Sequence, residues 1–353
     1  MIRIVQLTPP QISAAHIKEK ITCIRAHRER LFAISSEIIN GKLICHNYGQ
    51  GGAGWTFLFG SVNESMRQFE QQVAQDPALK HRQIVVVGAG CYGLLTAISL
   101  ARAGYAVRIV AKETENTSSS NAAGFFFPRS RKTSTAQENA IFQLLGLESY
   151  AVYQQVMQGQ HPFIRQGVQV LPIYFGLDID PGFSLYVERK LIAAPEKVII
   201  DFGTGKSYEV IEYKTLFINS TLLLAELKRV ITELGIVITR AEIESFDELP
   251  ESIIFNCTGA GAKKLTRDKR LINVQGHLIT LKNQPASEKM CYMLNVKVVM
   301  TDALGNSRDE LIYYSPKESG VLGITFIRGK RALLANEHEF DRLLLRCHDF
   351  FGV

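Results

Sequence analysis

The chain has 353 residues, of which 46% are hydrophobic and 21% charged. These fractions are close to the averages of globular proteins and exclude a disordered or fibrous protein. The net charge is +6, but the 40 Lys and Arg residues and the 34 Asp and Glu residues are spread along the chain. Because the positive charge is not concentrated, nucleic-acid binding is not predicted. The length predicts about two domains.

The six cysteines include no pair at the two-residue spacing of a zinc or redox motif. They are interpreted as reduced thiols of a cytoplasmic protein, and no metal site is predicted. The N-terminal residues lack the continuous apolar stretch of a signal peptide. No apolar run approaches the roughly 20 residues that span a bilayer, so no integral membrane segment is expected.

The first predicted elements surround a glycine-rich loop. A short strand is expected at 42–45, and the loop at 49–56 follows it. A helix is then predicted over 61–74, with Ser61 or Asn63 as its N-cap. A glycine-rich loop that opens onto a helix is suited to binding an anion.

A second strand–loop–helix unit follows a linker expected at about 73–81. Residues 84–87 read Ile-Val-Val-Val, which is typical of a buried parallel strand. A glycine turn at 88–93 leads into a helix that ends near Gly104, and a second strand is expected at 105–111. The turn has the glycine pattern GxGxxG, and its position between a strand and a helix indicates a nucleotide-binding motif and not a chance match.

The glycines of this turn predict a nucleotide site. Gly88, Gly90 and Gly93 allow main-chain N–H groups to approach a pyrophosphate at the helix N-terminus. An acidic residue is expected after the second strand to hold the ribose hydroxyls. Glu113 lies 20 residues after Gly93, and Lys112 is the alternative by position. The unit alone does not distinguish NAD from FAD.

Further elements are predicted in the C-terminal half. Asn219 and Ser220 are expected to cap a helix that ends at Gly235. The other predicted elements are strands at 236–243, 253–255, 277–281 and 311–314 and a helix at 339–351. Residues 146–215 show no clear periodicity.

Four blocks of the sequence, 111–130, 213–265, 274–283 and 311–326, resemble in this order the D-amino-acid oxidase family of FAD enzymes. The resemblance implies non-covalent FAD as the cofactor. It places the hydroxyl-rich stretch 117–124 beside the flavin, the loop 256–259 against the adenosine and pyrophosphate, and an apolar residue at the adenine. The cofactor-binding residues that it implies in these blocks are Ser119, Ser120, Ala123, Gly124, Ile243, Thr258 and Gly259.

The order of the segments differs from that family. Its arginine region, glycine loop and closing helix are expected after these blocks, but the chain stops at Val353 without them. Residues 23–28, 46–62 and 61–72 resemble these three segments instead. We therefore expect a circular permutation, closed through the linker at 73–81. The flavin-facing residues of the displaced loop are then Gly51, Gly52, Ala53, Gly54, Trp55 and Thr56.

The resemblance implies that a D-amino acid is oxidised by hydride transfer to the flavin. The products are a 2-oxo acid, ammonia and, after reoxidation by oxygen, hydrogen peroxide. Arg25 matches the arginine that binds the substrate carboxylate, and Arg28 is the register alternative. Tyr313 matches a site tyrosine, and the main chain of Gly52 faces the substrate amine.

Some site residues depart from the family pattern. Lys317 stands where the family has a second carboxylate-binding tyrosine, and Gln50 replaces a loop histidine. Lys317 could pair with a carboxylate, favour a substrate with a second acid group, or indicate lost activity. The alternatives are therefore oxidation of glycine, an N-methyl amino acid or another amine, an acceptor other than oxygen, or non-catalytic flavin binding.

We predict an α/β fold with a mixed α+β character. A discontinuous, Rossmann-like FAD-binding domain is expected from residues 20–125 and 213–270. A substrate domain with a mixed, largely antiparallel sheet is expected from residues 126–212 and 271–353, with residues 1–19 attached to it. The expected partners are an amino-acid substrate and molecular oxygen, and a homodimer is left open.

Overall fold

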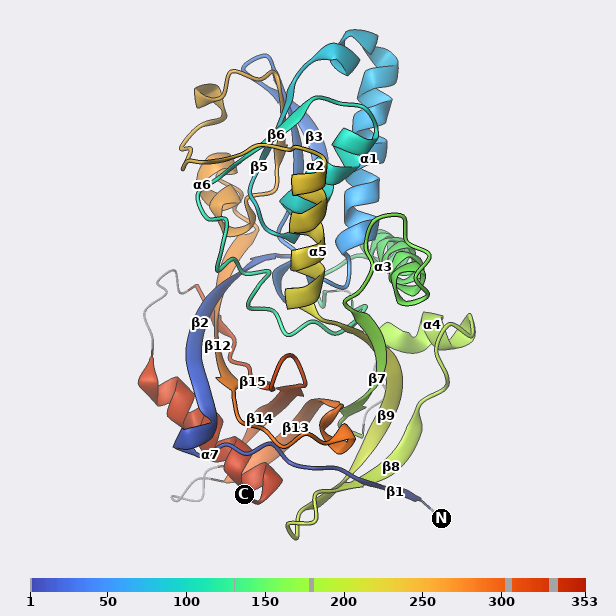
Figure 1. Cartoon of the computed structure of the whole chain (residues 1–353), viewed down its shortest axis with the longest axis vertical. Helices are drawn as coiled ribbons and strands as arrows, with labels where there is room; N and C mark the ends of the chain where they lie inside the picture. Colours follow the sequence, from blue (N-terminus) through green and yellow to red (C-terminus); the bar gives the residue numbers. More distant parts are fainter. Residues whose placement is uncertain (1, 130, 178–180, 302–306, 330–335) are drawn as a thin grey trace.

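The computed structural model describes residues 2–129, 131–177, 181–301, 307–329 and 336–353. These residues form two β-sheets with helices packed on them, as predicted for an α/β fold of mixed character. In Figure 1 the smaller sheet and its helices occupy the upper part of the view, and the larger sheet occupies the lower part. No helix in the described ranges is long and apolar enough to cross a membrane.

The smaller sheet has six strands in the order β10-β6-β5-β11-β4-β3. Its strands are β3 (Ala33–Ile39), β4 (Lys42–Tyr48), β5 (Ile84–Val87), β6 (Val107–Ala111), β10 (Ile238–Arg240) and β11 (Ile253–Asn256). Every neighbouring pair is parallel except β3–β4. The strand that precedes the first glycine loop therefore lies in the same parallel sheet as the strand that precedes the second.

Both faces of this sheet are covered, which explains the continuous apolar run of β5. Ile84 and Val86 pack with α1 (Leu58–Gln75), α2 (Cys91–Arg102) and α5 (Ser220–Glu233). Val85 and Val87 face the other way, toward Phe246 and its neighbours. Successive side chains of a strand alternate between faces, so a strand with two covered faces is apolar throughout.

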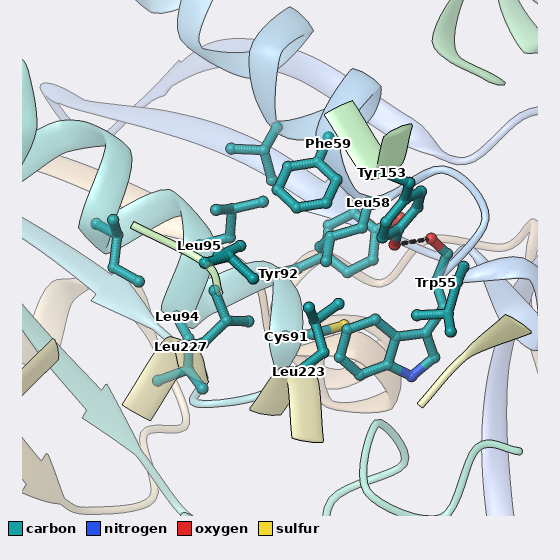
Figure 2. Close-up of a cluster of buried hydrophobic side chains, with 14 of the residues drawn as sticks. Trp55, Leu58, Phe59, Cys91, Tyr92, Leu94, Leu95, Tyr153, Leu223 and Leu227 are labelled. Carbon is teal, nitrogen blue, oxygen red and sulfur yellow. Dashed lines mark hydrogen bonds between the residues drawn. The ribbon is translucent and has the colours of Figure 1, made fainter. Parts of the chain in front are cut away.

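The residues that follow the two glycine loops share one core, which Figure 2 shows in close-up. Trp55 lies beside Cys91 and Tyr92, the first residues of α2. The Tyr92 hydroxyl donates to the carbonyl oxygen of Gly54 at 2.9 Å. The Tyr153 hydroxyl donates to the carbonyl oxygen of Trp55, as the dashed line in Figure 2 marks. These contacts fix one loop against the other.

The larger sheet has ten strands. They are β1 (Arg3–Gln6), β2 (Ile17–Arg28), β7 (Val168–Phe175), β8 (Glu196–Asp201), β9 (Ser207–Ile218), β12 (Leu271–Leu281), β13 (Met293–Thr301), β14 (Ser307–Ser315), β15 (Val321–Gly323) and β16 (Ile327–Arg328). The pairs β1–β8 and β7–β13 are parallel, and the other pairs in the described ranges are antiparallel. This is the mixed, largely antiparallel sheet expected from the sequence.

Four further helices and seven short turns accompany the two sheets in the described ranges. They are α3 (Ala136–Met157), α4 (Ser184–Glu188), α6 (Ala262–Thr266) and α7 (Glu337–Phe351), with short 3₁₀ turns η1 (Ala14–His16), η2 (Gly51–Ala53), η3 (Pro77–His81), η4 (Pro181–Phe183), η5 (Phe246–Glu248), η6 (Gly259–Gly261) and η7 (Glu288–Met290). The apolar side of α7, including Phe340 and Leu343, packs on Ile279 and Ile312 of the large sheet.

The first helix differs from its prediction. α1 begins at Leu58 and ends at Gln75, so Ser61 and Asn63 lie inside the helix and do not cap it. The Ser61 hydroxyl is buried and donates to Asn47 Oδ1 at 2.9 Å. Much of the expected linker at 73–81 is helical, because α1 continues to Gln75 and η3 covers Pro77–His81.

The expected domain boundaries also differ from the sheet assignments. β2 pairs with β12 over most of its length and so belongs to the larger sheet, although we expected the FAD-binding segment to begin at residue 20. β9 likewise crosses the expected boundary at residue 213. The boundary at residue 20 follows from the resemblance of residues 23–28 to a family segment, whereas the pairing of β2 with β12 joins residues far apart in the chain, which no local pattern reports.

Candidate active site

A cavity of about 870 Å³ is lined by residues of both sheets and of both glycine loops. The turns after β5, β6, β10 and β11 contribute Gly88, Lys112, Ile243 and Thr258. Because parallel strands end at the same edge of a sheet, these four turns gather at its carboxyl edge, where α/β sheets bind their ligands. Gly51, Gly52 and Gly88 thus line one cavity, as the predicted order of segments requires.

The turn between β5 and α2 presents main-chain donors to the cavity. Gly90 is the N-cap of α2 and has no side chain to satisfy the N–H groups of the first turn. Gly88 has φ +113°, and a Cβ there would lie 2.5 Å from the carbonyl oxygen of Cys257. Gly93 does not line the cavity; a Cβ on it would lie 1.9 Å from the carbonyl oxygen of Gly88. Gly93 therefore allows helix α2 to pack closely against the turn.

The hydroxyl-rich stretch forms a second wall. Ser119, Ala123 and Gly124 line the cavity, and Ser119 Oγ accepts from the N–H of Cys91 at 3.1 Å. Ser120 was also predicted to bind the cofactor, but its hydroxyl donates to the carbonyl oxygen of Thr117 at 2.8 Å and does not line the cavity. The Ser120 hydroxyl therefore stabilises the local turn, whereas the sequence pattern predicted that it binds the cofactor.

Lys317 stabilises the hydroxyl-rich stretch 117–124 through hydrogen bonds to its main chain. Its buried ammonium donates to the carbonyl oxygens of Ser120 and, at 3.0 Å, Ala122. Burial lowers the pKa of Lys317 to about 8. The lysine thus holds the loop through main-chain atoms, which differs from the carboxylate pairing considered for it above.

The predicted adenosine end includes Lys112, Glu113, Ile243, Thr258 and Gly259, all of which line the cavity. Glu113 lies 3.6 Å from Arg240, and Lys112 lies 3.0 Å from Glu242. Both side chains are more than half exposed. The geometry therefore leaves both as candidates for the ribose.

The first glycine loop brings Gly51, Gly52, Ala53, Gly54, Trp55 and Thr56 to the cavity. Gly51 has φ +65°, and a Cβ there would lie 3.1 Å from Nδ1 of His27. Trp55 Nε1 donates to the carbonyl oxygen of Ser119 at 3.1 Å. Thr56, which was expected to face the flavin, lines the cavity, and its hydroxyl donates to the carbonyl oxygen of Phe125 at 3.3 Å. Thr56 therefore holds the neighbouring chain segment.

β2 supplies side chains at every second position, Cys23, Arg25 and His27, which line the cavity together with Glu29 just after the strand. Arg25 is only 8% exposed, and burial lowers its pKa. Its Nη2 donates to the carbonyl oxygen of Thr325, and its Cζ lies 4.5 Å from the ring centre of Phe326. Its buried Nε has no hydrogen-bond partner among the described residues. A donor is therefore left for a ligand.

Arg28, the register alternative, is held elsewhere. Its Nε donates to Asp268 Oδ2 at 2.7 Å, and its Nη1 donates to the carbonyl oxygen of Leu31 at 2.6 Å. The alternation of the strand therefore favours Arg25 as the arginine of the site.

Tyr313 on β14 also lines the cavity. It is 7% exposed, and its ring centre lies 5.6 Å from that of Phe125. Burial raises the pKa of Tyr313, while the positive charge of Arg25 acts in the opposite direction. The tyrosine is thus a neutral hydroxyl in an apolar wall, near the guanidinium of Arg25.

His27 and Arg131 were missed by the sequence reasoning. His27 Nδ1 lies 2.7 Å from Arg131 Nη1, and Arg131 Nη2 donates to the carbonyl oxygens of Gly49 and Gln50 at 2.9 and 3.0 Å. The two-residue spacing from Arg25 is a signal that could have found His27. Arg131 directly follows the block at 111–130, and its partners lie far away in the sequence, so no local pattern could have found it.

Two other histidines have protein partners. His46 Nε2 lies 2.8 Å from Glu37 Oε1, and His277 Nδ1 lies 2.7 Å from Thr325 Oγ1. No cluster of three His, Cys, Asp or Glu side chains that could hold a metal ion is found in the described ranges.

The sequence model of a family described as "FAD dependent oxidoreductase" matches residues 83–353, which is well over half of the chain. The chain belongs to this family of FAD-dependent oxidoreductases. Its cofactor is accordingly FAD.

Similar proteins include two oxidases and one solved structure. A D-amino-acid oxidase of Streptomyces coelicolor is 30% identical over 205 residues, which cover 57% of this chain and 59% of that protein. A D-amino-acid oxidase of Schizosaccharomyces pombe is 26% identical over 265 residues, which cover 69% of this chain and 68% of that protein. The structure of an iminodiacetate oxidase from Chelativorans sp. BNC1 aligns with TM-score 0.49 and 13% identity, covering 76% of this chain and 79% of that one. The chain thus spans less than two thirds of the first of these oxidases.

The cavity of this FAD-dependent oxidoreductase fits its cofactor. At the N-terminus of α2, Ser119 accepts from the N–H of Cys91, and the other N–H groups of the first turn and the positive dipole end are suited to a pyrophosphate. A side chain on Gly88 would collide with the main chain at Cys257. The glycine therefore lets the turn pack against Cys257. The cavity extends from Ile243 and Thr258 to Arg25 and Tyr313, which leaves room for a long ligand whose ends lie at different sheets.

Proposed function

We propose that this protein oxidises a D-amino acid. The amino acid, oxygen and water give a 2-oxo acid, ammonia and hydrogen peroxide. The supporting observation is Arg25, whose side chain is 8% exposed and lines the cavity of a flavoenzyme, and whose Nε has no hydrogen-bond partner among the described residues. A buried cation of this kind is suited to hold a carboxylate through two parallel hydrogen bonds.

The residues around Arg25 have complementary roles in this proposal. Arg25 binds the carboxylate and so fixes which face of the substrate Cα points into the cavity. The main chain of Gly52 faces the amine, and Tyr313 supplies an apolar wall with one hydroxyl. Bound FAD supplies the two-electron oxidant for the Cα–H bond. The protein groups contribute orientation and exclude water.

We also propose that the chain is a circular permutation of the family's segment order. Three observations support this. β4 lies parallel to β11, which in turn lies parallel to β5. Both glycine loops line the same cavity. The family match begins at residue 83, after the first loop and its helix.

The remaining parts of the proposal concern the surroundings of the enzyme. Molecular oxygen is the proposed acceptor. The cytoplasm is the proposed compartment, because all six cysteines are free and five of them are buried. A homodimer stays a hypothesis.

The function is tested by an anaerobic absorbance spectrum of the purified holoenzyme. Bleaching of the flavin by D-amino acids, and not by their L-enantiomers, is expected. Bleaching by glycine or an N-methyl amino acid alone would assign another amine substrate. A flavin that stays oxidised with all of these would contradict the proposal and favour non-catalytic flavin binding.

The role of Arg25 is tested by Arg25→Met. Removing one partner of a buried charge pair costs about 2–5 kcal/mol. We therefore expect kcat/KM to fall by at least 30-fold (about 2 kcal/mol), while the purified protein keeps its flavin spectrum. Unchanged turnover would show that another group binds the carboxylate.

A further inference from the structure

Three guanidinium groups surround His27 at the substrate side of the cavity. The charges of Arg131, Arg328 and Arg25 all lower the pKa of His27, which places the three cations close to one imidazole. Arg328 has an acidic partner, since its Nη2 lies 2.7 Å from Glu29 Oε1. Arg25 is assigned above to the substrate carboxylate. Arg131 remains to be explained.

Arg131 is a partly buried cation without a carboxylate in ion-pair contact in the described part of the chain. Its contacts are His27 Nδ1 and the carbonyl oxygens of Gly49 and Gln50, and its buried Nε has no hydrogen-bond partner among the described residues. Burial lowers the pKa of Arg131 to about 10, so the group is still charged at neutral pH. A buried charge without a counter-ion is costly, so an anionic ligand at this point would stabilise the site.

His27 adds a donor to the same place. A guanidinium can only donate, so Nδ1 of His27 accepts from Arg131 and the proton of the neutral ring is on Nε2. With a pKa of about 4, the ring is neutral at pH 7 and adds no further positive charge. Arg25 and His27 are two residues apart on one face of β2, which corresponds to about 7 Å between their Cα atoms.

We propose that Arg131 and His27 bind a second acid group of the substrate, and that the substrate is a dicarboxylic D-amino acid of the aspartate or glutamate kind. The inference rests on the proposed function and makes its substrate class specific. The two carboxyl carbons of such amino acids lie roughly 4–5 Å apart by their bond lengths. One carboxylate at Arg25 and the other beside the hydrogen-bonded pair of His27 and Arg131 is therefore compatible with the spacing along β2.

The anion bound at Arg131 and His27 could belong to the cofactor instead of the substrate, so the experiment has to distinguish these two sources.

The holoenzyme is assayed with D-glutamate and D-aspartate and with the neutral D-norvaline and D-alanine. The wild-type protein, Arg131→Met and Arg131→Lys are compared. Arg189→Leu is the matched control, because Arg189 is exposed and lies outside the cavity.

The expected result is a change of specificity. The wild-type protein should have a higher kcat/KM for the dicarboxylic substrates, and Arg131→Met should lower the ratio of kcat/KM for D-glutamate to that for D-norvaline by on the order of 100-fold. Arg131→Lys should restore part of this ratio. The control should keep the wild-type ratio, and all variants should keep the wild-type dissociation constant for FAD.

Other outcomes would overturn the inference. A wild-type preference for the neutral substrates would contradict it directly. An equal loss for both substrate classes, with weaker FAD binding or a shifted flavin potential in Arg131→Met, would assign the charge of Arg131 to the cofactor. If neither class bleaches the flavin, the proposed function itself fails, and the substrate class with it.

Discussion

We expect His27 to make the stability of the protein depend on pH. Burial and the charges of Arg131, Arg328 and Arg25 lower its pKa from 6.5 to about 4 in the folded protein. Between these values the unfolded chain binds more protons, so the free energy of unfolding falls as the pH falls from 6.5 to 4. The shift corresponds to about 3 kcal/mol, which solvent screening at this partly exposed site reduces to about 1–2 kcal/mol.

Urea denaturation at pH 7.5 and pH 4.5 measures this effect in the wild-type protein and in His27→Gln. Glutamine keeps an acceptor for Arg131 and removes the titration. The wild-type protein should lose about 1–2 kcal/mol more than the variant between the two pH values. Equal losses would show that His27 is protonated in the folded state as easily as in the unfolded chain.

At the scale of elements, the junction of β5 and α2 depends on Gly93. A Cβ on Gly93 would lie 1.9 Å from the carbonyl oxygen and 2.8 Å from the carbonyl carbon of Gly88, and both are main-chain atoms that cannot rotate away. Gly93→Ala should therefore lower the free energy of unfolding by about 3 kcal/mol and weaken FAD binding, because the turn must open. Thermal unfolding and release of FAD fluorescence measure the two effects.

Gly104, at the other end of α2, provides the matched control. It has φ +88°, but no atom lies within 4 Å of a Cβ built on it. Gly104→Ala should therefore cost only the backbone strain, about 1–2 kcal/mol, with FAD retained. If the two alanine variants behave alike, the close approach at Gly93 does not limit the turn.

The predictability of each element from the sequence depends on how local its signals are. β5, α2, α5 and α7 were predicted within a few residues, because apolar periodicity, Asn219 and the glycines at the turns act within one element. β2 was missed because its alternation is broken, since Lys18, Glu19 and Lys20 are consecutive polar residues and Arg28 follows His27. The start of α1 was misplaced because burial of Leu58 and Phe59 outweighed the cap signal of Ser61.

The candidate site shows the same limit. The glycines and Arg25 were assigned from motifs that are continuous in the sequence, and all of them but Gly93 line the cavity. Arg131 could not, because its partners Gly49, Gln50 and His27 lie about 80–104 residues away in the chain. Ser120 and Thr56 were assigned to the cofactor, but their hydroxyls hydrogen-bond to main-chain atoms.

At the scale of the whole molecule, the proposed permutation requires that the order of segments can change while the site stays the same. The Thr204 hydroxyl donates to the carbonyl oxygen of Phe351 at 2.6 Å, and the N–H of Leu7 donates to the carbonyl oxygen of Asp201 at 2.9 Å. Both ends of the chain therefore lie near the β8–β9 hairpin, and Figure 1 shows them at the same end of the molecule. A flexible Gly/Ser linker of about 12 residues has a reach of roughly 20 Å, enough to join neighbouring ends.

A recut chain tests the proposed permutation. It begins at His81, runs to Val353, continues through the linker to Ile2 and ends at Lys80, so that the new cut lies in the exposed turn η3. Because both glycine loops still line one cavity, this chain should bind FAD and retain turnover within about threefold, since the cut removes few contacts. A control with the same linker, cut between Ala89 and Gly90, interrupts the turn that presents the N-terminus of α2 and should bind no FAD. A chain recut at η3 that folds but binds no FAD would show that the connection from α1 to β5 is needed to align the two loops. This result would contradict the proposal that the chain differs from the family only in the order of its segments.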